Sequence, residues 1–559
     1  MKKLISVILC LALLFSCAAI TAAAAETELK ITVANDLHLD LTSVTAEKVS
    51  KKNNLSEEYA HVASGGQLHY ESLAIINAFL AEAAKNESEF ILLPGDITNK
   101  GTAEEHEALA SILKEFEETS GKQVFVINGN HDLLKTEASA FKEYYADFGY
   151  NEALAVDSSS ASYTAELSNG YRLLAIDSCA PRLSTHTMDE ERISWIEEQC
   201  KKASEDGKKL IAIMHHNLLE HYILSSKIHK GSVVNDGTNN LADVLADGGV
   251  KFIFTAHTHD HDIASYTTAK GNTIYDAVTT SINAYPCAYR VVSFGKDVKI
   301  ETRKITAIDT SALPEGIHET ALALAKSNFL EYAKNTTYLG LKVIISSYLN
   351  ATALKKLLDT NNETVNAVID KAGTKIEKIA SMPMYTADET VKGESVETLA
   401  KELGTTLPAT EYKTVLDLVV YIYQSHVEGD ENHAAYTDEM ILLTRALAVA
   451  INYALSDITT EDFTVILQFV AELLNANISD TILGILGGTL GRFHGSELFI
   501  TTAVLPVLAE FGTDDPPKDN NVTLPGYNST EKAESFLDKI ISFFKKIFDF
   551  FRMLFAIGK

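Results

Sequence analysis

The chain of 559 residues contains 46% hydrophobic and 22% charged residues, which is typical of folded globular domains and excludes a disordered or wholly membrane-embedded chain. Aspartate and glutamate outnumber lysine and arginine by 76 to 48, so the formal net charge is -28. A protein of this charge repels phosphate backbones, and we therefore expect no general nucleic-acid binding.

The first 25 residues have the layout of a secretory signal peptide. Lys2 and Lys3 precede an apolar run from Leu4 to Phe15, and Ala22–Ala25 offers a small-residue cleavage site. This layout predicts a protein that is secreted or attached to the outer surface of the cell. Two alternatives stay open: the segment remains as a membrane anchor, or it is cleaved before a lipidated Cys17 in a sequence similar to a bacterial lipoprotein box.

From Leu29 to Arg303, short β-rich runs alternate with longer stretches of helical periodicity. The predicted strands are Leu29–Ala34, Phe90–Leu93, Gln123–Ile127, Arg172–Ile176, Lys209–Met214 and Lys251–Ala256, followed by Thr273–Val278, Tyr289–Phe294 and Asp297–Arg303. The predicted helices between them include Tyr70–Lys85, Ala103–Thr119 and Asp189–Glu205. This alternation predicts an α/β domain with buried sheets over residues 26–310.

Residues 311–512 are predicted to form a mainly α-helical domain. Its helical segments are Glu315–Tyr332, Asn362–Ile379, Lys413–Gln424, Glu439–Tyr453 and Glu461–Leu474. The segments show no fixed-period repeat, which argues against a solenoid. We predict that this domain packs on the α/β domain and shapes access to it. The polar stretch from His426 to His433 is expected to be a solvated connection, with a cap over an active site as the alternative.

The end of the chain is predicted to be a linker, residues 513–529, followed by an amphipathic basic helix, residues 530–559. From Ser535 to Lys559, five basic residues outnumber two acidic ones, against the trend of the chain: Lys539, Lys545, Lys546, Arg552 and Lys559. A basic amphipathic helix suits the surface of an anionic membrane. The alternative is that the helix packs on the helical domain.

Polar residues follow five of the predicted strands at the point where each strand ends. They are Asp36 and His38, Asp96, Asn130 with His131 and Asp132, His215 with His216, and His257 with His259. Because α/β sheets place their ligand sites at the carboxyl ends of strands, we expect these side chains to meet. Each short motif also occurs by chance. Their joint occurrence, in order and at strand ends, is what predicts a site.

The residue types favour a metal centre. The cysteines outside the leader, Cys179, Cys200 and Cys287, form neither a disulfide framework nor a Cys-x-x-Cys pair, so oxygen and nitrogen ligands would hold the metal. Carboxylate, amide and imidazole groups suit Mn, Fe, Zn, Co or Ni ions. The ligands exceed the needs of one ion and suit two. Two ions lower the pKa of a bridging water and neutralise a bound phosphate.

These blocks resemble those of the calcineurin-like metallophosphoesterases. The matching residues are Asp36-Leu37-His38, Gly95-Asp96, Gly129-Asn130-His131-Asp132, His215 and His257-Thr258-His259. The resemblance spans Leu29 to Arg303 and implies a four-layer α/β/β/α sandwich with a dinuclear metal site. The sequence departs from the family pattern at Ala256, where glycine is usual, and at Asn217, where a proline often follows the paired histidines.

The resemblance also implies a role for each residue. Asp36, His38 and His259 would hold one divalent or trivalent ion, and Asn130, His215 and His257 would hold the other. Asp96 would bridge the two ions. His131 would not be a ligand; it would stabilise the transition state or protonate the leaving oxygen, with Asp132 as an orienting partner.

The sequence therefore predicts a hydrolase of small phosphate esters that uses hydroxide activated by two metal ions. Phosphodiesters and phosphomonoesters both stay open as substrates, because the same metals serve both reactions. Two other classes of function also stay open. One is a non-catalytic binding scaffold that retains the fold, and the other is a membrane-surface adaptor whose function lies in the helical half and the tail.

Overall fold

The computed structural model describes residues 28–41, 59, 62, 65–222, 225–313, 316–358, 361–386, 394–434, 437–473, 478–488, 491–505, 509, 512–514 and 517–527. The predicted signal peptide, with Cys17, and the predicted basic helix, residues 530–559, lie outside the described residues. Within the described residues, no helix combines the length and the apolar character needed to cross a membrane.

One of the two sheets has six strands in the order β13-β12-β11-β1-β2-β3. Its strands are β1 (Leu29–Val33), β2 (Phe90–Pro94), β3 (Gln123–Ile127), β11 (Ala288–Phe294), β12 (Asp297–Lys304) and β13 (Asn521–Pro525). Strands β1, β2 and β3 are parallel, and β11, β12 and β13 continue the sheet in antiparallel pairs. The carboxyl ends of the three parallel strands therefore lie at one edge.

The other sheet has seven strands in the order β4-β5-β6-β7-β8-β10-β9. Its strands are β4 (Ala153–Val156), β5 (Tyr163–Glu166), β6 (Tyr171–Ile176), β7 (Lys209–Met214), β8 (Val250–Thr255), β9 (Asp262–Thr267) and β10 (Thr273–Val278). Strands β6, β7, β8 and β10 are parallel to one another, whereas β4, β5 and β9 are antiparallel to their neighbours. The sheet thus has a parallel centre and antiparallel edges.

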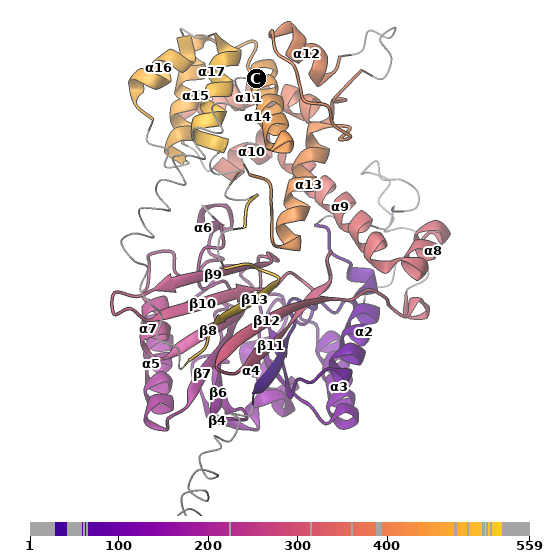
Figure 1. Cartoon of the computed structure of the whole chain (residues 1–559), viewed down its shortest axis with the longest axis vertical. Coiled ribbons are helices and arrows are strands. Elements are labelled where there is room, and N and C mark those ends of the chain that lie inside the picture. The colour runs from indigo at the N-terminus through magenta and orange to yellow at the C-terminus, as the bar shows by residue number, and fades with distance from the viewer. Residues whose placement is uncertain are drawn as a thin grey trace, which may run out of the picture.

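The two sheets pack face to face, and helices cover their outer faces (Figure 1). Side chains alternate between the two sides of each strand: Leu92 faces the core between the sheets, whereas Ile91 and Leu93 face the helices outside. Helices α2 (Ser72–Lys85), α3 (Ala103–Ser120) and α4 (Ala138–Tyr144) lie on the first sheet, and α5 (Glu190–Glu205) and α7 (Leu241–Asp247) lie on the second. This is the predicted four-layer α/β/β/α sandwich.

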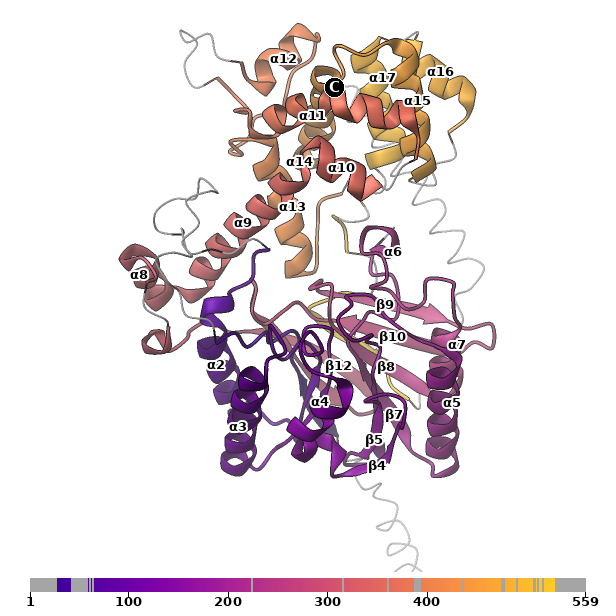
Figure 2. The same ribbon diagram turned by 180° about the vertical axis from the view of Figure 1, so that it is seen from behind.

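A second core belongs to the helical domain, which stands above the carboxyl edge of the sheets in Figures 1 and 2. Its helices are α8 (Glu319–Ser327), α9 (Phe329–Tyr348), α10 (Ala351–Leu358), α11 (Glu363–Ser381), α12 (Val396–Glu402), α13 (Val415–Glu428), α14 (Asp438–Ala454), α15 (Thr460–Leu473), α16 (Asp480–Gly488) and α17 (Arg492–Phe499). The helix predicted over Glu315–Tyr332 is divided at Asn328, because this residue leaves helical geometry and caps α9 by accepting a hydrogen bond from the amide of Glu331.

The segment predicted to be a linker, residues 513–529, contains the edge strand β13. Strand β13 pairs antiparallel with β12, from Asn521 opposite Glu301 to Pro525 opposite Asp297. Its inward-facing Leu524 is 5% exposed and joins the core between the sheets. The linker prediction is therefore wrong for residues 521–525. The polar composition of this segment gives no clear strand signal. Because β13 pairs with β12, the helical domain is an insertion in the chain between these two strands.

Candidate metal centre

The seven predicted ligands meet at the carboxyl ends of five parallel strands. Asp36 and His38 follow β1, Asp96 follows β2, Asn130 follows β3, His215 follows β7, and His257 and His259 follow β8. Three of these strands belong to the first sheet and two to the second. The site therefore lies where both sheets of the sandwich present their carboxyl edges.

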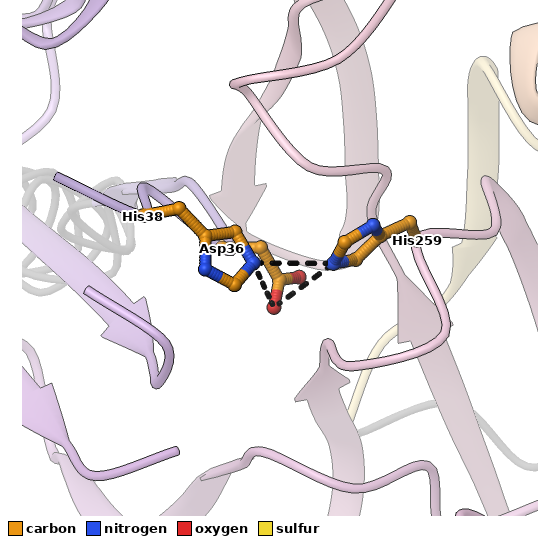
Figure 3. Close-up of side chains that lie close together, drawn as sticks. All are labelled: Asp36, His38 and His259. Atoms are coloured by element: carbon orange, nitrogen blue, oxygen red, sulfur yellow. Dashed lines mark hydrogen bonds and ion pairs between the residues drawn. The ribbon is translucent and has the colours of Figure 1, made fainter. Parts of the chain in front are cut away.

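Asp36, His38 and His259 form one group, in which one potential ligand atom of each residue lies within 4.8 Å of the others. The Nε2 atoms of His38 and His259 are 3.4 Å apart, and Nε2 of His259 is 3.6 Å from Oδ1 of Asp36 (Figure 3). The side chains come from the ends of two strands, β1 and β8, and converge on one point. This is the set that the sequence predicts for the first ion.

Asp96, His215 and His257 form the second group. Nε2 of His215 lies 3.0 Å from Oδ1 of Asn130, 3.3 Å from Oδ2 of Asp96 and 3.1 Å from Nδ1 of His257. The same Oδ2 of Asp96 is 4.0 Å from Nε2 of His38, which belongs to the first group. Asp96 thus lies between the groups, where a bridging ligand has to lie.

Five of the seven predicted ligands adopt a left-handed backbone conformation. The φ angles are 49° at Asp36, 43° at His38, 46° at Asp96, 72° at His257 and 61° at His259. Such angles are costly for residues with a Cβ atom and persist where the surrounding structure determines them. The backbone is therefore bent at the site so that these side chains turn inward.

Glycines provide the space for this bend. A Cβ atom at Gly95 would lie 2.7 Å from the amide nitrogen of Gly129 and 2.8 Å from Nδ1 of His215, and one at Gly129 would overlap Asp96. Real Cβ atoms do not approach other atoms this closely. The glycines in the Gly95-Asp96 and Gly129-Asn130 blocks are therefore required by the close approach of the two loops.

Hydrogen bonds from outside the predicted set orient the histidines. Nδ1 of His131 donates to the carbonyl oxygen of Asn99 at 2.6 Å, and Nδ1 of His215 donates to that of Pro94 at 3.1 Å. The hydroxyl of Ser232 lies 2.9 Å from Nε2 of His257. The sequence did not predict these partners, because backbone carbonyls have no residue signature and Ser232 lies in a polar loop. They are the outer contacts that fix ring orientation in metal sites.

Two residues next to the predicted ligands have structural roles. Asp132 does not orient His131, as the sequence suggested; its carboxylate accepts hydrogen bonds from the amides of Gly129 and Thr98. It therefore holds the two glycine-containing loops together. His216 is fully buried, with Nδ1 2.9 Å from the hydroxyl of Ser178, so it is a packed core residue rather than a substrate contact.

Burial and neighbouring charges set the pKa values in the site. Burial, together with the adjacent His131, lowers the pKa of His38, and burial with His216 lowers that of His257. Burial also opposes the charged form of His215, but Asp96 outweighs it and raises the pKa of His215 to about 9. Burial likewise opposes ionisation of Asp96, yet the histidines around it hold its pKa well below the usual value.

The donor set fits two transition-metal ions. Asp36 and Asp96 are 0% and 2% exposed and lie beside histidines rather than in solvent. Buried carboxylates need counter-charges, and a mixture of carboxylate, amide oxygen and imidazole is a common ligand set for divalent transition metals. Either group of side chains offers three or more such donors to one ion.

Comparison with known proteins agrees with this geometry. Residues 29–261 match the family model of the calcineurin-like phosphoesterases. This part of the chain is similar to the members of that enzyme family. The match covers the whole set of predicted ligands and ends shortly before the last strands of the phosphoesterase domain, whereas the helical insertion lies outside it.

Individual relatives are distant. The chain is 24% identical over 247 residues to a probable glycerophosphodiester phosphodiesterase from Arcobacter nitrofigilis, which covers 43% of this chain and 81% of the relative. Among solved structures, a dimetal phosphatase from Danio rerio is 9% identical, with a TM-score of 0.36, and covers 50% of this chain and 98% of that one. A purple acid phosphatase from yellow lupin (Lupinus luteus) is 11% identical, with a TM-score of 0.32, and covers 50% and 52% of the two chains.

Proposed function

We infer that the protein hydrolyses small phosphate esters with two metal ions held between the sheets, and that it does so outside the cytoplasm. One observation carries the proposal: Asp96 lies between two groups of buried and half-buried donors, Asp36 with His38 and His259, and His215 with His257 and Asn130. When bound, the two ions supply a Lewis-acid centre that activates water and neutralises the phosphate oxygens.

The protein's own residues then have separate tasks. The donors of the two groups would hold the ions, and His215 and His257 would present the nitrogens that their outer hydrogen bonds leave available. His131 keeps its proton on Nδ1 through the Asn99 carbonyl, so its Nε2 is available to transfer a proton to or from a substrate oxygen. Because His131 is not fully buried, a bound ester has access to it.

The substrate class is proposed from chemistry and from the curated relative. The relative is a probable glycerophosphodiester phosphodiesterase, which supports a small phosphodiester as the first substrate to test. Phosphomonoesters are the second class, because the same two-ion chemistry serves both. The acidic chain, with its net charge of -28, argues against long polyanions as substrates.

The location is proposed from the sequence of the chain ends. Residues 1–25 support export, with lipidation of Cys17 as the alternative, and residues 530–559 support contact with an anionic membrane surface. Fractionation of cells that express the full chain tests the first point. Sedimentation with anionic vesicles, with and without residues 530–559, tests the second, and equal sedimentation of the two proteins rejects the membrane contact.

The activity is tested with purified full-length protein freed of metal and then supplied with Mn²⁺ or Zn²⁺. We expect hydrolysis of bis(p-nitrophenyl) phosphate, of p-nitrophenyl phosphate or of a glycerophosphodiester, and its loss on addition of a chelator. The ratio of the rates on the diester and the monoester assigns the substrate class. A protein that binds no transition metal and hydrolyses none of these esters is the non-catalytic scaffold instead.

A further inference from the structure

Helix α13 of the helical insertion ends on the loop that carries His257 and His259. His426, in the last turn of α13, is buried, and its Nε2 lies 3.3 Å from Oδ1 of Asp260. Its Nδ1 lies 2.6 Å from Oε1 of Glu431. Asp260 directly follows His259 in the chain. The stretch predicted to be a solvated connection therefore begins with a buried histidine that contacts the residue next to a predicted metal ligand.

The residues after α13 cover the same loop. The Oδ1 atom of Asp519 accepts a 3.1 Å hydrogen bond from the amide of Ile263, and Oδ2 accepts one from the amide of Asp430, also at 3.1 Å. Gly429, with φ of +71°, lies so close to the loop that a Cβ atom there would be 2.9 Å from Cδ2 of His261. The insertion thus contacts the chain immediately after His259 through His426, Gly429 and Asp519.

Helix α9 contacts the segment on the other side of His259. The hydroxyl of Thr337 donates to the carbonyl oxygen of Gly66 at 2.7 Å and accepts from the amide of Tyr285 at 3.0 Å. The next residue, Gln67, places Nε2 3.3 Å from Nδ1 of His259. Figures 1 and 2 show α9 and α13 side by side above the sheets. The two helices are joined by a hydrogen bond from Gln424 to the carbonyl oxygen of Lys334 at 3.1 Å.

These contacts are made to a loop whose backbone conformation is unfavourable. The φ angles of His257 and His259, 72° and 61°, are left-handed and persist only where the surroundings determine them. Asp260 is 1% exposed, and a buried carboxylate that loses its partner is strongly destabilised. We therefore expect that, without His426, Asp260 turns toward water and that this movement displaces His259 from its group.

We propose that the helical insertion completes the metal centre, with His426 as a positioning residue that acts through Asp260 on His259. The inference rests on the proposed function, because it assigns part of the ligand geometry to a domain that contributes no ligand. It gives the insertion a role beyond shaping access: its two helices hold the segments on both sides of His259. His426 itself contacts neither substrate nor ion.

The test measures metal binding in the full-length protein. Mn²⁺ is titrated into metal-free protein, and the electron paramagnetic resonance signal of free Mn²⁺ reports the affinity of each ion. We expect the wild type to bind two ions. In His426→Ala, we expect the affinity for one of them to fall by about tenfold or more, as for other outer partners of metal ligands. The control is His433→Ala, which removes a buried histidine that packs on Tyr421 within the helical domain. We expect wild-type affinities in this control.

A double-mutant comparison shows whether the effect passes through His259. We expect His259→Ala to lose the same ion that His426→Ala weakens, and the double variant to bind its remaining ion as His259→Ala does. Further weakening of the remaining ion in the double variant would show a general structural effect and overturn the inference. If His426→Ala does not fold by circular dichroism, Asp260→Asn replaces it in both comparisons, because it keeps the side-chain shape and removes the charge.

The outcomes separate this inference from the proposed function. A wild type that binds two ions, together with a His426→Ala variant that binds both with wild-type affinity, overturns the positioning role and leaves the proposed function intact. A wild type that binds no ion overturns both. The Asn130, His215 and His257 group supplies an internal reference, because its ion is expected to bind equally well in the wild type and in His426→Ala.

Discussion

Nδ1 of His131 donates a 2.6 Å hydrogen bond to the carbonyl oxygen of Asn99. A carbonyl oxygen only accepts hydrogen bonds, so this contact places a proton on Nδ1. It leaves Nε2 as the nitrogen that is available to a substrate. The His131 and His38 rings lie with their centroids 4.7 Å apart, at the edge of the first donor group. The orientation of the His131 ring is therefore fixed by a backbone group that no substitution removes.

We expect His131→Ala to lower kcat for phosphate-ester hydrolysis by about 10²–10⁴-fold, which is the usual contribution of a positioned acid or base. Metal content should stay at the wild-type value, because the proposed role of His131 is proton transfer. Steady-state kinetics and elemental analysis of the same preparation check both points. The control is His494→Ala, an exposed histidine on α17. Loss of an ion in His131→Ala would show that this residue is a ligand.

Asp36 and Asp96 should differ in how many ions they affect. Asp36 belongs to one donor group, whereas Oδ2 of Asp96 lies 3.3 Å from His215 in one group and 4.0 Å from His38 in the other. We therefore expect Asp36→Asn to lower the binding affinity for one ion and Asp96→Asn to lower it for both ions. Isothermal titration with Mn²⁺ distinguishes the two patterns. Equal effects of the two substitutions on a single ion would contradict the bridging role.

His215 and His216 are adjacent in the chain, so substitutions at the two positions provide a variant and its matched control. Nε2 of His215 points at Asp96 and Asn130, whereas His216 bonds to the hydroxyl of Ser178 and the carbonyl oxygen of Ser184. We expect His215→Ala to lose an ion. His216→Ala should bind both ions but lose about 1–3 kcal/mol of stability, because buried polar groups are left without partners. Metal analysis and urea unfolding of both variants provide the measurement, and loss of an ion in His216→Ala would reverse the assignment.

The central strands and the site could be predicted because their sequence signals are local. Gln123–Ile127 and Lys209–Met214 are apolar runs buried on both faces, and they match β3 and β7 residue for residue. Each is followed at once by the polar residues of the site. Strand direction then brings these residues together without further information, since parallel strands share a carboxyl edge.

Other features depend on contacts that the local sequence does not contain. Strand β9, Asp262–Thr267, was not predicted because it is an edge strand in which only Ile263 is buried and the other residues are half-buried or exposed. His426 lies in a polar stretch, and its partner Asp260 is distant in the sequence, so nothing near it predicts burial. The left-handed φ angle of Asp96 likewise arises where its loop packs closely against Gly129. These are tertiary effects that override local preference.

One buried histidine outside the donor groups should make a contribution to the free energy of unfolding that falls as the pH rises. His221 lies 2.6 Å from a carboxylate oxygen of Asp262 and 3.2 Å from one of Asp276. Burial opposes its charged form, but the two carboxylates outweigh burial and raise its pKa from 6.5 to about 10. A histidine with a raised folded-state pKa contributes stability that is complete below its unfolded-state pKa and is lost as pH rises through the folded-state pKa.

The stability advantage of the wild type over His221→Gln should therefore be largest below pH 6.5 and shrink as the pH rises toward about 10. The slope is at most about 1.4 kcal/mol per pH unit. Urea unfolding between these pH values, with a chelator present so that metal binding does not contribute, measures the difference. His494→Gln, on an exposed face of α17, should show no such dependence. An advantage that is constant with pH would mean that the folded-state pKa of His221 is not raised.

Strand β13 should be needed for the stability of the phosphoesterase domain, although it follows the helical insertion in the chain. Leu524 is buried in the core between the sheets, whereas Thr523 on the same strand points to solvent. We expect Leu524→Ala to cost about 2–5 kcal/mol and Thr523→Ala to cost much less, because only the first leaves a cavity. Unfolding followed by circular dichroism measures both. A strand at the edge of the sheet cannot lose its buried leucine without loss of stability. Equal, small losses in the two variants would therefore show that residues 521–525 behave as the linker that their composition suggests.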